Sequence, residues 1–276
     1  EELELEEFRV DMLALKADAR QPQVLIRAGL RHPMCRGVLA LTSDDTANLA
    51  AVTAARLLNP ALQVIARAHA TETVALMRSF GKLQVVNPFE AFADQLMLAM
   101  RAPGCYRLFD WLTAPQGSEL DKEHRPPRGA WVVCGYGRFG RALADRLAAE
   151  GLHVRIIDPS PPASKRHSLI PGDGTESTVL ELAGLGSAEG LIAGTDDDLR
   201  NLAIANLARS LNPKLFTVLR QNDAANSVLV DDFHADLVMR PSEIVADECV
   251  ALLTSPLLLR FLENLRSEGE AWADEL

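Results

Sequence analysis

Six residues, Gly135 to Gly140, have the glycine spacing of a phosphate-binding loop. They read Gly-Tyr-Gly-Arg-Phe-Gly and follow the apolar segment 131–134. Because glycine has no side chain, Gly135 permits a tight turn, Gly137 lets a pyrophosphate approach the backbone, and Gly140 lets the next helix pack closely. That helix would present unpaired N–H groups and a positive dipole end to the phosphates. The chemistry expected here is the binding of an anionic nucleotide.

An acid follows this loop at the distance expected of a ribose ligand. Asp158 closes a second apolar segment, residues 153–158, and lies 18 residues after Gly140. Such a carboxylate accepts hydrogen bonds from an adenosine ribose, and its charge favours a free 2′-hydroxyl over a 2′-phosphate. We expect NAD(H) or an adenine nucleotide (ATP, ADP or AMP), although Lys165 and Arg166 nearby leave NADP open. The alternative, a strand–turn–helix whose glycines serve packing alone, fits this context less well.

A parallel sheet is needed to position these residues. From residue 130 on, short apolar runs alternate with amphipathic ones, and 190–193 is apolar throughout, as in a strand covered on both faces. Strands are expected at 130–135, 153–158, 167–171, 190–193, 215–219 and 235–239. Helices are expected at 138–150, 176–183, 197–211, 224–230 and from Pro241 on. This alternation predicts an α/β fold with a Rossmann-like, doubly wound parallel sheet.

The chain also repeats itself. Residues 37–88 match residues 190–241 without a gap, at a constant offset of 153 positions. Both copies contain Thr-x-Asp-Asp-x-x-Asn, which begins at Thr42 and at Thr195. A self-match of this length indicates duplication of a whole domain rather than a short structural repeat. We therefore expect two Rossmann-like domains in tandem, each followed by a crossover helix: residues 1–117, a linker at 118–129, and residues 130–276.

The first copy matches the second only from the third strand onward. Nothing in residues 1–16 corresponds to the strand, glycine loop and helix at 131–150. In this type of sheet the first strand lies centrally, so a domain without it would bury unpaired backbone groups. We expect more chain upstream of Glu1 or, as the alternative, completion of the domain by another subunit.

Helices that trail the two domains are the expected partner surfaces. Pro88 begins a helix that Pro103 breaks, and Pro241 begins a helix that Pro256 breaks. Further apolar helices are expected after these breaks, at 106–112 and 257–265. Large apolar residues beyond a compact sheet usually mark a surface for a partner.

Composition excludes several classes of protein. A net charge of −10 and a pI near 5.1 argue against nucleic-acid binding, which needs a basic face. No segment reaches the roughly 18 uninterrupted apolar residues that a membrane helix needs. The four cysteines show no paired spacing, which fits reduced thiols in the cytosol.

Taken together, these motifs resemble the regulator-of-potassium-conductance family, whose domains are also called RCK, KTN or TrkA-N. The resemblance covers nearly the whole chain, twice, and includes Gly172–Thr175, the run from Thr195 to Leu202, and the Leu-Asn-Pro at 211–213. It implies a cytosolic, nucleotide-sensing regulatory subunit or domain at the inner face of the membrane. Its partner would be a potassium channel or transporter pore, fused upstream or on another chain. Homo-oligomers, as dimers or higher rings, are also implied.

The resemblance implies roles for individual residues by position. The glycine loop would hold the phosphates with help from Arg138, and Asp158 would hold the ribose. Asp173 would line the adenine side, and Thr195 with Asp196 would border the cleft after the fourth strand. The expected nucleotide-binding residues are Gly135, Tyr136, Gly137, Arg138, Phe139, Gly140, Asp158, Asp173, Thr195 and Asp196.

Some polar residues have two interpretations. Residues 196–198 could bind a divalent metal, but acids at a helix start are more simply explained as N-caps, and we expect no metal. Asn48 and Asn201 are expected to bond to a neighbouring loop rather than to a ligand. Arg67 and Arg220 each end a strand, so each could reach the cleft or pair with a carboxylate.

Three functions remain in competition at this point. The first is a ligand-sensing regulator with no catalytic residues. The second is an NAD-dependent oxidoreductase on a Rossmann fold, which would need a substrate domain and a proton-transfer residue. The third is a structural dimerisation module with an inactive nucleotide site, against which the intact glycines and Asp158 argue. The fold alone does not decide among them.

Overall fold

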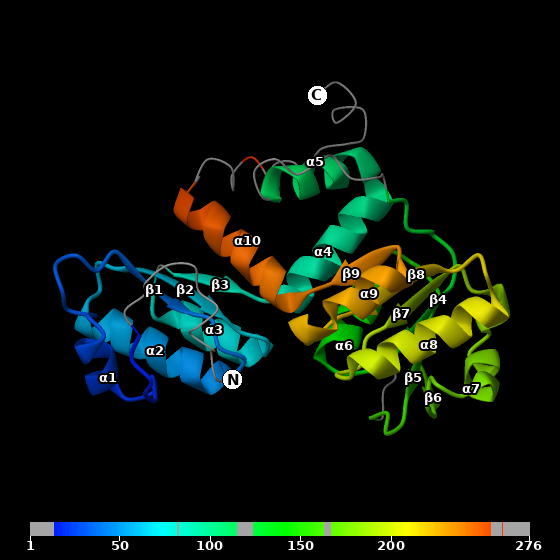
Figure 1. Cartoon of the computed structure of the whole chain (residues 1–276), viewed down its shortest axis with the longest axis horizontal. Helices are drawn as coiled ribbons and strands as arrows, with labels where there is room; N and C mark the ends of the chain where they lie inside the picture. The colour runs from blue at the N-terminus through cyan, green and yellow to red at the C-terminus, as the bar shows by residue number, and fades with distance from the viewer. Residues whose placement is uncertain (1–13, 82, 115–123, 163–166, 255–260, 262–276) are drawn as a thin grey trace. The chain divides into compact units, whose positions relative to one another are not determined.

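The computed structural model describes residues 14–81, 83–114, 124–162, 167–254 and 261 (Figure 1). Contacts divide the chain into two units whose boundary lies between Val85 and Val86. Of the predicted linker, only residues 124–129 are described, so the predicted domain limits at 117 and 130 remain predictions.

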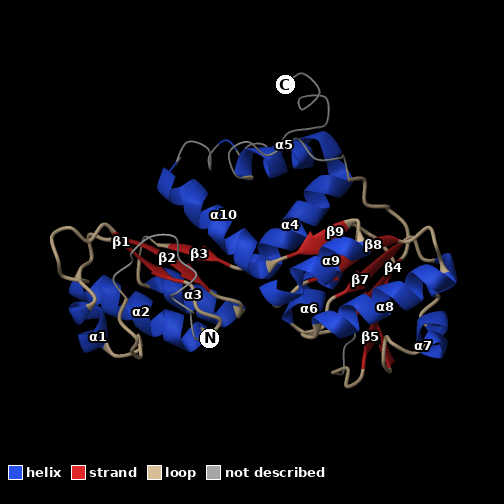
Figure 2. Ribbon diagram, viewed as in Figure 1, coloured by secondary structure: helices blue, strands red, loops and turns tan. Residues whose placement is uncertain are grey.

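The second unit is built on a six-stranded parallel sheet (Figure 2). Its strands are β4 (Trp131–Cys134), β5 (Val154–Asp158), β6 (Ser168–Pro171), β7 (Gly190–Ala193), β8 (Phe216–Arg220) and β9 (Leu237–Met239). The strand order is β6-β5-β4-β7-β8-β9, so the first strand in sequence lies in the middle of the sheet. Trp131 of β4 accordingly pairs with Val154 on one side and Gly190 on the other. The predicted doubly wound sheet is confirmed.

Helices connect these strands close to the predicted limits. They are α6 (Arg138–Ala149), α7 (Ser177–Leu182), α8 (Asp198–Leu211) and α9 (Ser227–Phe233), with short 3₁₀ turns at Leu185–Ser187 and Ala224–Asn226. The helix expected at 224–230 differs, because its first turn is 3₁₀ and α9 continues to Phe233. It ends where His234 adopts a left-handed conformation with a φ of 52°.

Both faces of strand β4 are covered, which explains why its sequence is apolar without interruption. Trp131 and Val133 contribute to the core layer on one side of the sheet, whereas Val132 and Cys134 contribute to the layer on the other. All four are buried. Burial raises the pKa of the Cys134 thiol to about 12, so this cysteine stays protonated and serves packing.

Three further helices belong to the second unit: α4 (Pro88–Arg101), α5 (Pro103–Thr113) and α10 (Pro241–Thr254). Helices α4 and α10 begin at Pro88 and Pro241, as predicted, whereas α5 begins at Pro103, which was expected only to break the preceding helix. Helix α4 packs on α6, with the rings of Phe89 and Phe92 5.9 and 5.8 Å from that of Phe139. The predicted segment 106–112 lies within α5, while 257–265, apart from residue 261, lies outside the described residues. None of the described helices is long and apolar enough to cross a membrane.

The first unit contains a three-stranded sheet in the order β1-β2-β3. Its elements are α1 (Pro22–Arg27), β1 (Gly37–Ala40), α2 (Asp45–Leu58), β2 (Gln63–Arg67), α3 (Thr71–Ser79) and β3 (Gln84–Val86). These strands correspond to the last three of the second unit. Residues 14–16, the described residues before α1 that align with the end of β6, form no strand.

Candidate nucleotide-binding site

The glycine loop joins β4 to α6, and each glycine meets a different constraint. Gly135 has a φ of 98°, a left-handed conformation that L side chains rarely adopt. A Cβ on Gly140 would lie 1.9 Å from the carbonyl oxygen of Gly135, so a side chain there cannot be accommodated. A Cβ on Gly137 would meet nothing within 4 Å in the part of the chain that the structure describes. The geometry thus assigns the turn to Gly135 and close packing to Gly140, and it leaves the space in front of Gly137 open.

Helix α6 begins at this loop without a side-chain cap. Its N-cap is Gly137, and among the described residues no side chain accepts a hydrogen bond from its first turn. The first N–H groups of an α-helix have no partner within the helix, so they are free to bind an anion. The side chain of Phe139 points into the core and is fully buried, so of the expected ligands Phe139 could contribute only its backbone N–H.

Asp158 ties the glycine loop to the end of β5. Its Oδ2 accepts the backbone N–H of Tyr136 at 2.8 Å, and its Oδ1 accepts that of Ser160 at 2.9 Å. A carboxylate oxygen can accept more than one hydrogen bond, so the ribose role predicted for Asp158 is compatible with these contacts. The side chain therefore has a structural task as well, because it holds the loop in place.

Asp173, just after β6, is paired with an arginine that the sequence analysis did not single out. Its Oδ1 accepts the backbone N–H of Thr175 at 3.0 Å, and its Oδ2 lies 2.6 Å from Nη2 of Arg200. The hydrogen bond from Thr175, followed by the charge of Arg200, holds the pKa of Asp173 below its usual value. The signal for Arg200 is its place in the first turn of α8, a few residues after Thr195 and Asp196, which were predicted to border the cleft.

Thr195 and Asn201 form a closed network after β7. The N–H and hydroxyl of Thr195 both donate to Oδ1 of Asn201, at 2.8 and 2.7 Å. Nδ2 of Asn201 donates to the carbonyls of Thr195 and Arg220, at 3.0 and 2.8 Å. The expectation that this asparagine bonds to a neighbouring loop is confirmed. The Thr195 side chain is engaged in shaping the turn.

The three acids that follow have three different tasks. Asp197 caps α8 by accepting the N–H of Arg200 at 3.0 Å. Asp198 is buried and accepts N–H groups from the next loop, including that of Asp223 at 3.0 Å. Burial opposes its ionisation, but the hydrogen bonds from that loop outweigh it, so the pKa of Asp198 is lowered. Capping is thus confirmed for Asp197, whereas Asp198 holds the next loop. No group of three or more metal-binding side chains occurs among the described residues.

Asp196 is exposed and forms an ion pair with Arg220. Its Oδ1 lies 2.6 Å from Nη1 of Arg220, at the end of β8. Arg220 was expected either to reach the cleft or to pair with a carboxylate. It pairs with the carboxylate of Asp196, a residue that was predicted to border the cleft.

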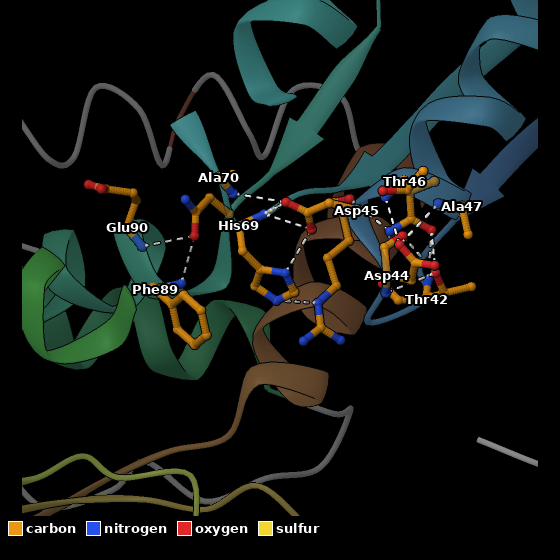
Figure 3. Close-up of polar contacts among 12 residues, drawn as sticks. Thr42, Asp44, Asp45, Thr46, Ala47, His69, Ala70, Phe89 and Glu90 are labelled. Atoms are coloured by element: carbon orange, nitrogen blue, oxygen red, sulfur yellow. Dashed lines mark hydrogen bonds and ion pairs between the residues drawn. The ribbon is translucent and has the colours of Figure 1, made fainter. Parts of the chain in front are cut away.

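The first unit repeats the asparagine network and the aspartate cap at the ends of β1 and β2 (Figure 3). Nδ2 of Asn48 donates to the carbonyls of Thr42 and Arg67, at 2.8 and 2.9 Å. Asp44 caps α2 by accepting the N–H of Thr46 at 2.8 Å. Figure 3 shows Asp45 between the backbone of the loop after β2, whose N–H groups it accepts, and the ring of His69. Oδ1 of Asp45 lies 2.8 Å from Nδ1 of His69.

A parallel sheet of this order, with a glycine loop after its central strand and an acid at the end of the next, defines a Rossmann-type nucleotide-binding domain. The chain matches the model of the TrkA-N domain over residues 1–88 and again over 131–241. It therefore belongs to the TrkA-N family and carries that domain twice, as its resemblance to the RCK family implied.

Individual relatives come from potassium transport systems. The chain is 31% identical over 136 residues to a Trk system potassium uptake protein TrkA homolog of Pyrococcus abyssi. This match covers 45% of this chain and 60% of the relative. It is 26% identical over 147 residues to Potassium channel protein 1 of Methanocaldococcus jannaschii, which covers 51% of this chain and 44% of that protein. The chain thus spans about half of these relatives.

Solved structures extend the similarity over most of the chain. The crystal structure of GsuK bound to ADP has a TM-score of 0.65 and 25% identity, and the match covers 86% of this chain and 56% of that one. The GsuK channel bound to NAD has a TM-score of 0.66 at 20% identity, over 86% of this chain and 54% of that one. The second of these supports the fold alone.

Proposed function

We propose that this chain is the nucleotide-sensing regulatory part of a potassium channel or potassium transport system. Membership of the TrkA-N family and the potassium-system names of its relatives support the system. The observation that carries the proposal is the open, uncapped N-terminus of α6 at Gly137, with Asp158 at the end of the neighbouring strand. The ligand is NAD(H) or an adenine nucleotide, and the structure of GsuK with ADP supports the latter.

Contacts between α4 and α6 offer a route from ligand to partner. Helix α6 begins at the glycine loop, and Arg146 near its end lies 3.3 Å from Glu90 and 2.8 Å from Asp94 of α4. Phe89, in the first turn of α4, contacts the ring of Phe139 inside the loop. A ligand that shifts the start of α6 would therefore shift α4. Regulation requires that the ligand bind two such arrangements with different affinity.

The partner is a membrane pore, on this chain or another, and the regulatory part lies at the inner face of the membrane as a homo-oligomer. Its role is regulatory rather than catalytic. The alternative, an NAD-dependent oxidoreductase, requires an accessible proton-transfer group near the nicotinamide. His167 has a carboxylate partner, Asp145 at 2.9 Å, but its ring is 2% exposed and is therefore poorly placed for that task.

Two glycine variants test the site. Gly137→Ala has room for its Cβ in the folded protein, but the methyl group would occupy the space where a phosphate approaches. We expect ADP, ATP, AMP or NADH to raise the melting temperature of the wild type and not that of Gly137→Ala. Gly186→Ala, which also has an open Cβ position, is the matched control and should respond like the wild type. Thermal stabilisation by no nucleotide at all, or turnover of NAD with a hydroxy acid, would contradict the proposal.

A further inference from the structure

Arg220 is a buried cation whose anionic partner, Asp196, is exposed to solvent. Its side chain is 11% exposed, and its one hydrogen-bond partner within the described residues is Asp196, which is 91% exposed. The Nε–H group of Arg220 is buried and meets no acceptor in that part of the chain. Buried polar groups are almost always hydrogen-bonded, and buried charges are almost always paired. A buried guanidinium with one solvated partner therefore has capacity for another anion.

Arg220 is also close to a second cation. Its guanidinium carbon lies 5.1 Å from the ring centroid of Phe89 and 5.8 Å from that of Phe139. The guanidinium of Arg138 lies 6.0 Å from the same Phe89 ring. Burial lowers the pKa of Arg220, and the charge of Arg138 acts in the same direction. Two like charges gathered at one ring repel each other, and an anion between them would relieve that repulsion.

The strand order places this pair on a defined side of the glycine loop. Asp158 lies on β5, on one side of β4, whereas Arg220 ends β8, two strands from β4 on the other side. Neighbouring strands are about 4.8 Å apart, so Arg220 lies roughly 10 Å across the sheet from the loop strand. A nucleotide with its ribose at Asp158 and its first phosphate at the loop would direct its next group toward Arg220.

We propose that Arg220 and Arg138 bind the terminal phosphate of a nucleoside diphosphate, and that this phosphate displaces Asp196 from Arg220. The inference rests on the proposed nucleotide site and names the ligand class that it prefers. An ion pair with an exposed carboxylate is weak, whereas a phosphate carries more charge and several acceptor oxygens. AMP lacks the second phosphate, and the nicotinamide of NAD⁺ would bring a positive charge to two guanidinium groups. ADP is therefore preferred over both.

Calorimetric titration of the full chain with ADP, AMP and NAD⁺ tests this preference. In Arg220→Gln, ADP should bind roughly 10- to 100-fold more weakly, and AMP less than about threefold more weakly, since one charged hydrogen-bonding partner is lost. Asp196→Asn should bind ADP about threefold more tightly and AMP unchanged, since the competing carboxylate is removed. Arg200→Gln, which alters the partner of Asp173 on the adenine side, is the control and should affect ADP and AMP equally.

The outcomes separate this inference from the proposed function. Equal losses of ADP and AMP in Arg220→Gln, or NAD⁺ binding more tightly than ADP to the wild type, would overturn the inference while leaving a nucleotide sensor. Silence with every nucleotide would overturn both. Should Arg220→Gln fail to fold, Asp196→Asn decides the matter, because its side chain is exposed. An unchanged ADP affinity in Asp196→Asn would contradict the proposal that the phosphate displaces Asp196 from Arg220.

Discussion

The two copies of the Thr-x-Asp-Asp-x-x-Asn motif build the same turn in two different settings. In both, asparagine Oδ1 accepts the N–H of the threonine, at 3.0 Å for Asn48 and 2.8 Å for Asn201. In both, Nδ2 donates to the carbonyl of the arginine at the end of the next strand, at 2.9 and 2.8 Å. The first unit shows no glycine loop in its described residues, so this turn forms without one. The motif is therefore a structural device and does not define a ligand site by itself.

The arginines at the ends of these strands are used differently. In the first unit Nε of Arg67 donates to Nε2 of His69 at 3.0 Å, and the ring in turn contacts Asp45. In the second unit Asn222 replaces the histidine and bonds to Asp198, and Arg220 turns to Asp196. The substitution of histidine by asparagine thus accompanies release of the arginine toward the glycine loop. What distinguishes the candidate site is this arginine together with the glycine loop that follows β4.

Replacing the shared asparagine should have the largest effect. Asn201→Ala removes the partner of the Thr195 N–H and of the Arg220 carbonyl and one of the two donors to the Thr195 carbonyl, so we expect a loss of about 2–4 kcal/mol in unfolding free energy. Asn48→Ala should lose a similar amount. Hydrogen exchange should localise the faster opening to 190–220 in the first variant and to 37–67 in the second.

Leu199→Ala is the control for this pair, because Leu199 is 60% exposed on the same helix as Asn201. It should change stability by less than about 0.5 kcal/mol. A stable Asn48→Ala beside a destabilised Asn201→Ala would show that the two turns are not equivalent.

The buried acids come next and add a pH dependence. For Asp45, burial opposes ionisation, but the N–H groups of Ala70 and His69 outweigh it, and the pKa is lowered as it is for Asp198. A carboxyl whose pKa is lower in the folded state stabilises the protein above its unfolded pKa, about 3.9, and loses that contribution as the pH falls through its folded pKa. Asp45→Asn and Asp198→Asn should each lose about 1.5–3 kcal/mol at pH 7.

Urea unfolding between pH 2 and 7 measures this effect. Each variant should show a shallower loss of stability below about pH 4 than the wild type does. Parallel curves for variant and wild type would mean that these carboxyls keep the same pKa on unfolding, contrary to the hydrogen bonds they accept.

Exchanging the residue that distinguishes the turns should have a smaller effect. In His69→Asn the new amide can donate to Asp45, as Nδ2 of Asn222 donates to Asp198 at 2.8 Å. We expect a change within about 1 kcal/mol, whereas His69→Ala removes the donor and should cost more. Equal losses in these two variants, measured by urea unfolding, would show that ring packing rather than the hydrogen bond matters at this position.

Sequence patterns predicted what depends on local backbone chemistry. The strand order follows from alternating apolar runs, the roles of Gly135 and Gly140 follow from the lack of a side chain, and the cap at Asp197 follows from its place before a helix. These features need only neighbours along the chain or the general rules of parallel sheets.

Long-range packing could not be predicted in the same way. Asp173 and Arg200, which form an ion pair, lie 27 positions apart in the sequence, and this spacing does not predict their contact. The burial of Phe139 depends on α4, since Phe89 and Phe92 cover it. A loop residue that appears exposed in a glycine-rich sequence is thus turned into a core residue by a helix from elsewhere in the chain.

The smallest effect is expected at the first copy's arginine, and it tests the comparison most directly. Arg67 occupies the position of Arg220 in the repeat, but it contacts His69 and lies in the unit whose described residues contain no glycine loop. Arg67→Gln should therefore leave the ratio of ADP to AMP affinity unchanged within about twofold, whereas Arg220→Gln should lower it at least about tenfold. Calorimetry on the two variants measures both ratios. A fall in both would mean that the arginines act through the turn that the copies share, while a fall in Arg220→Gln alone ties the effect to the arginine beside the glycine loop.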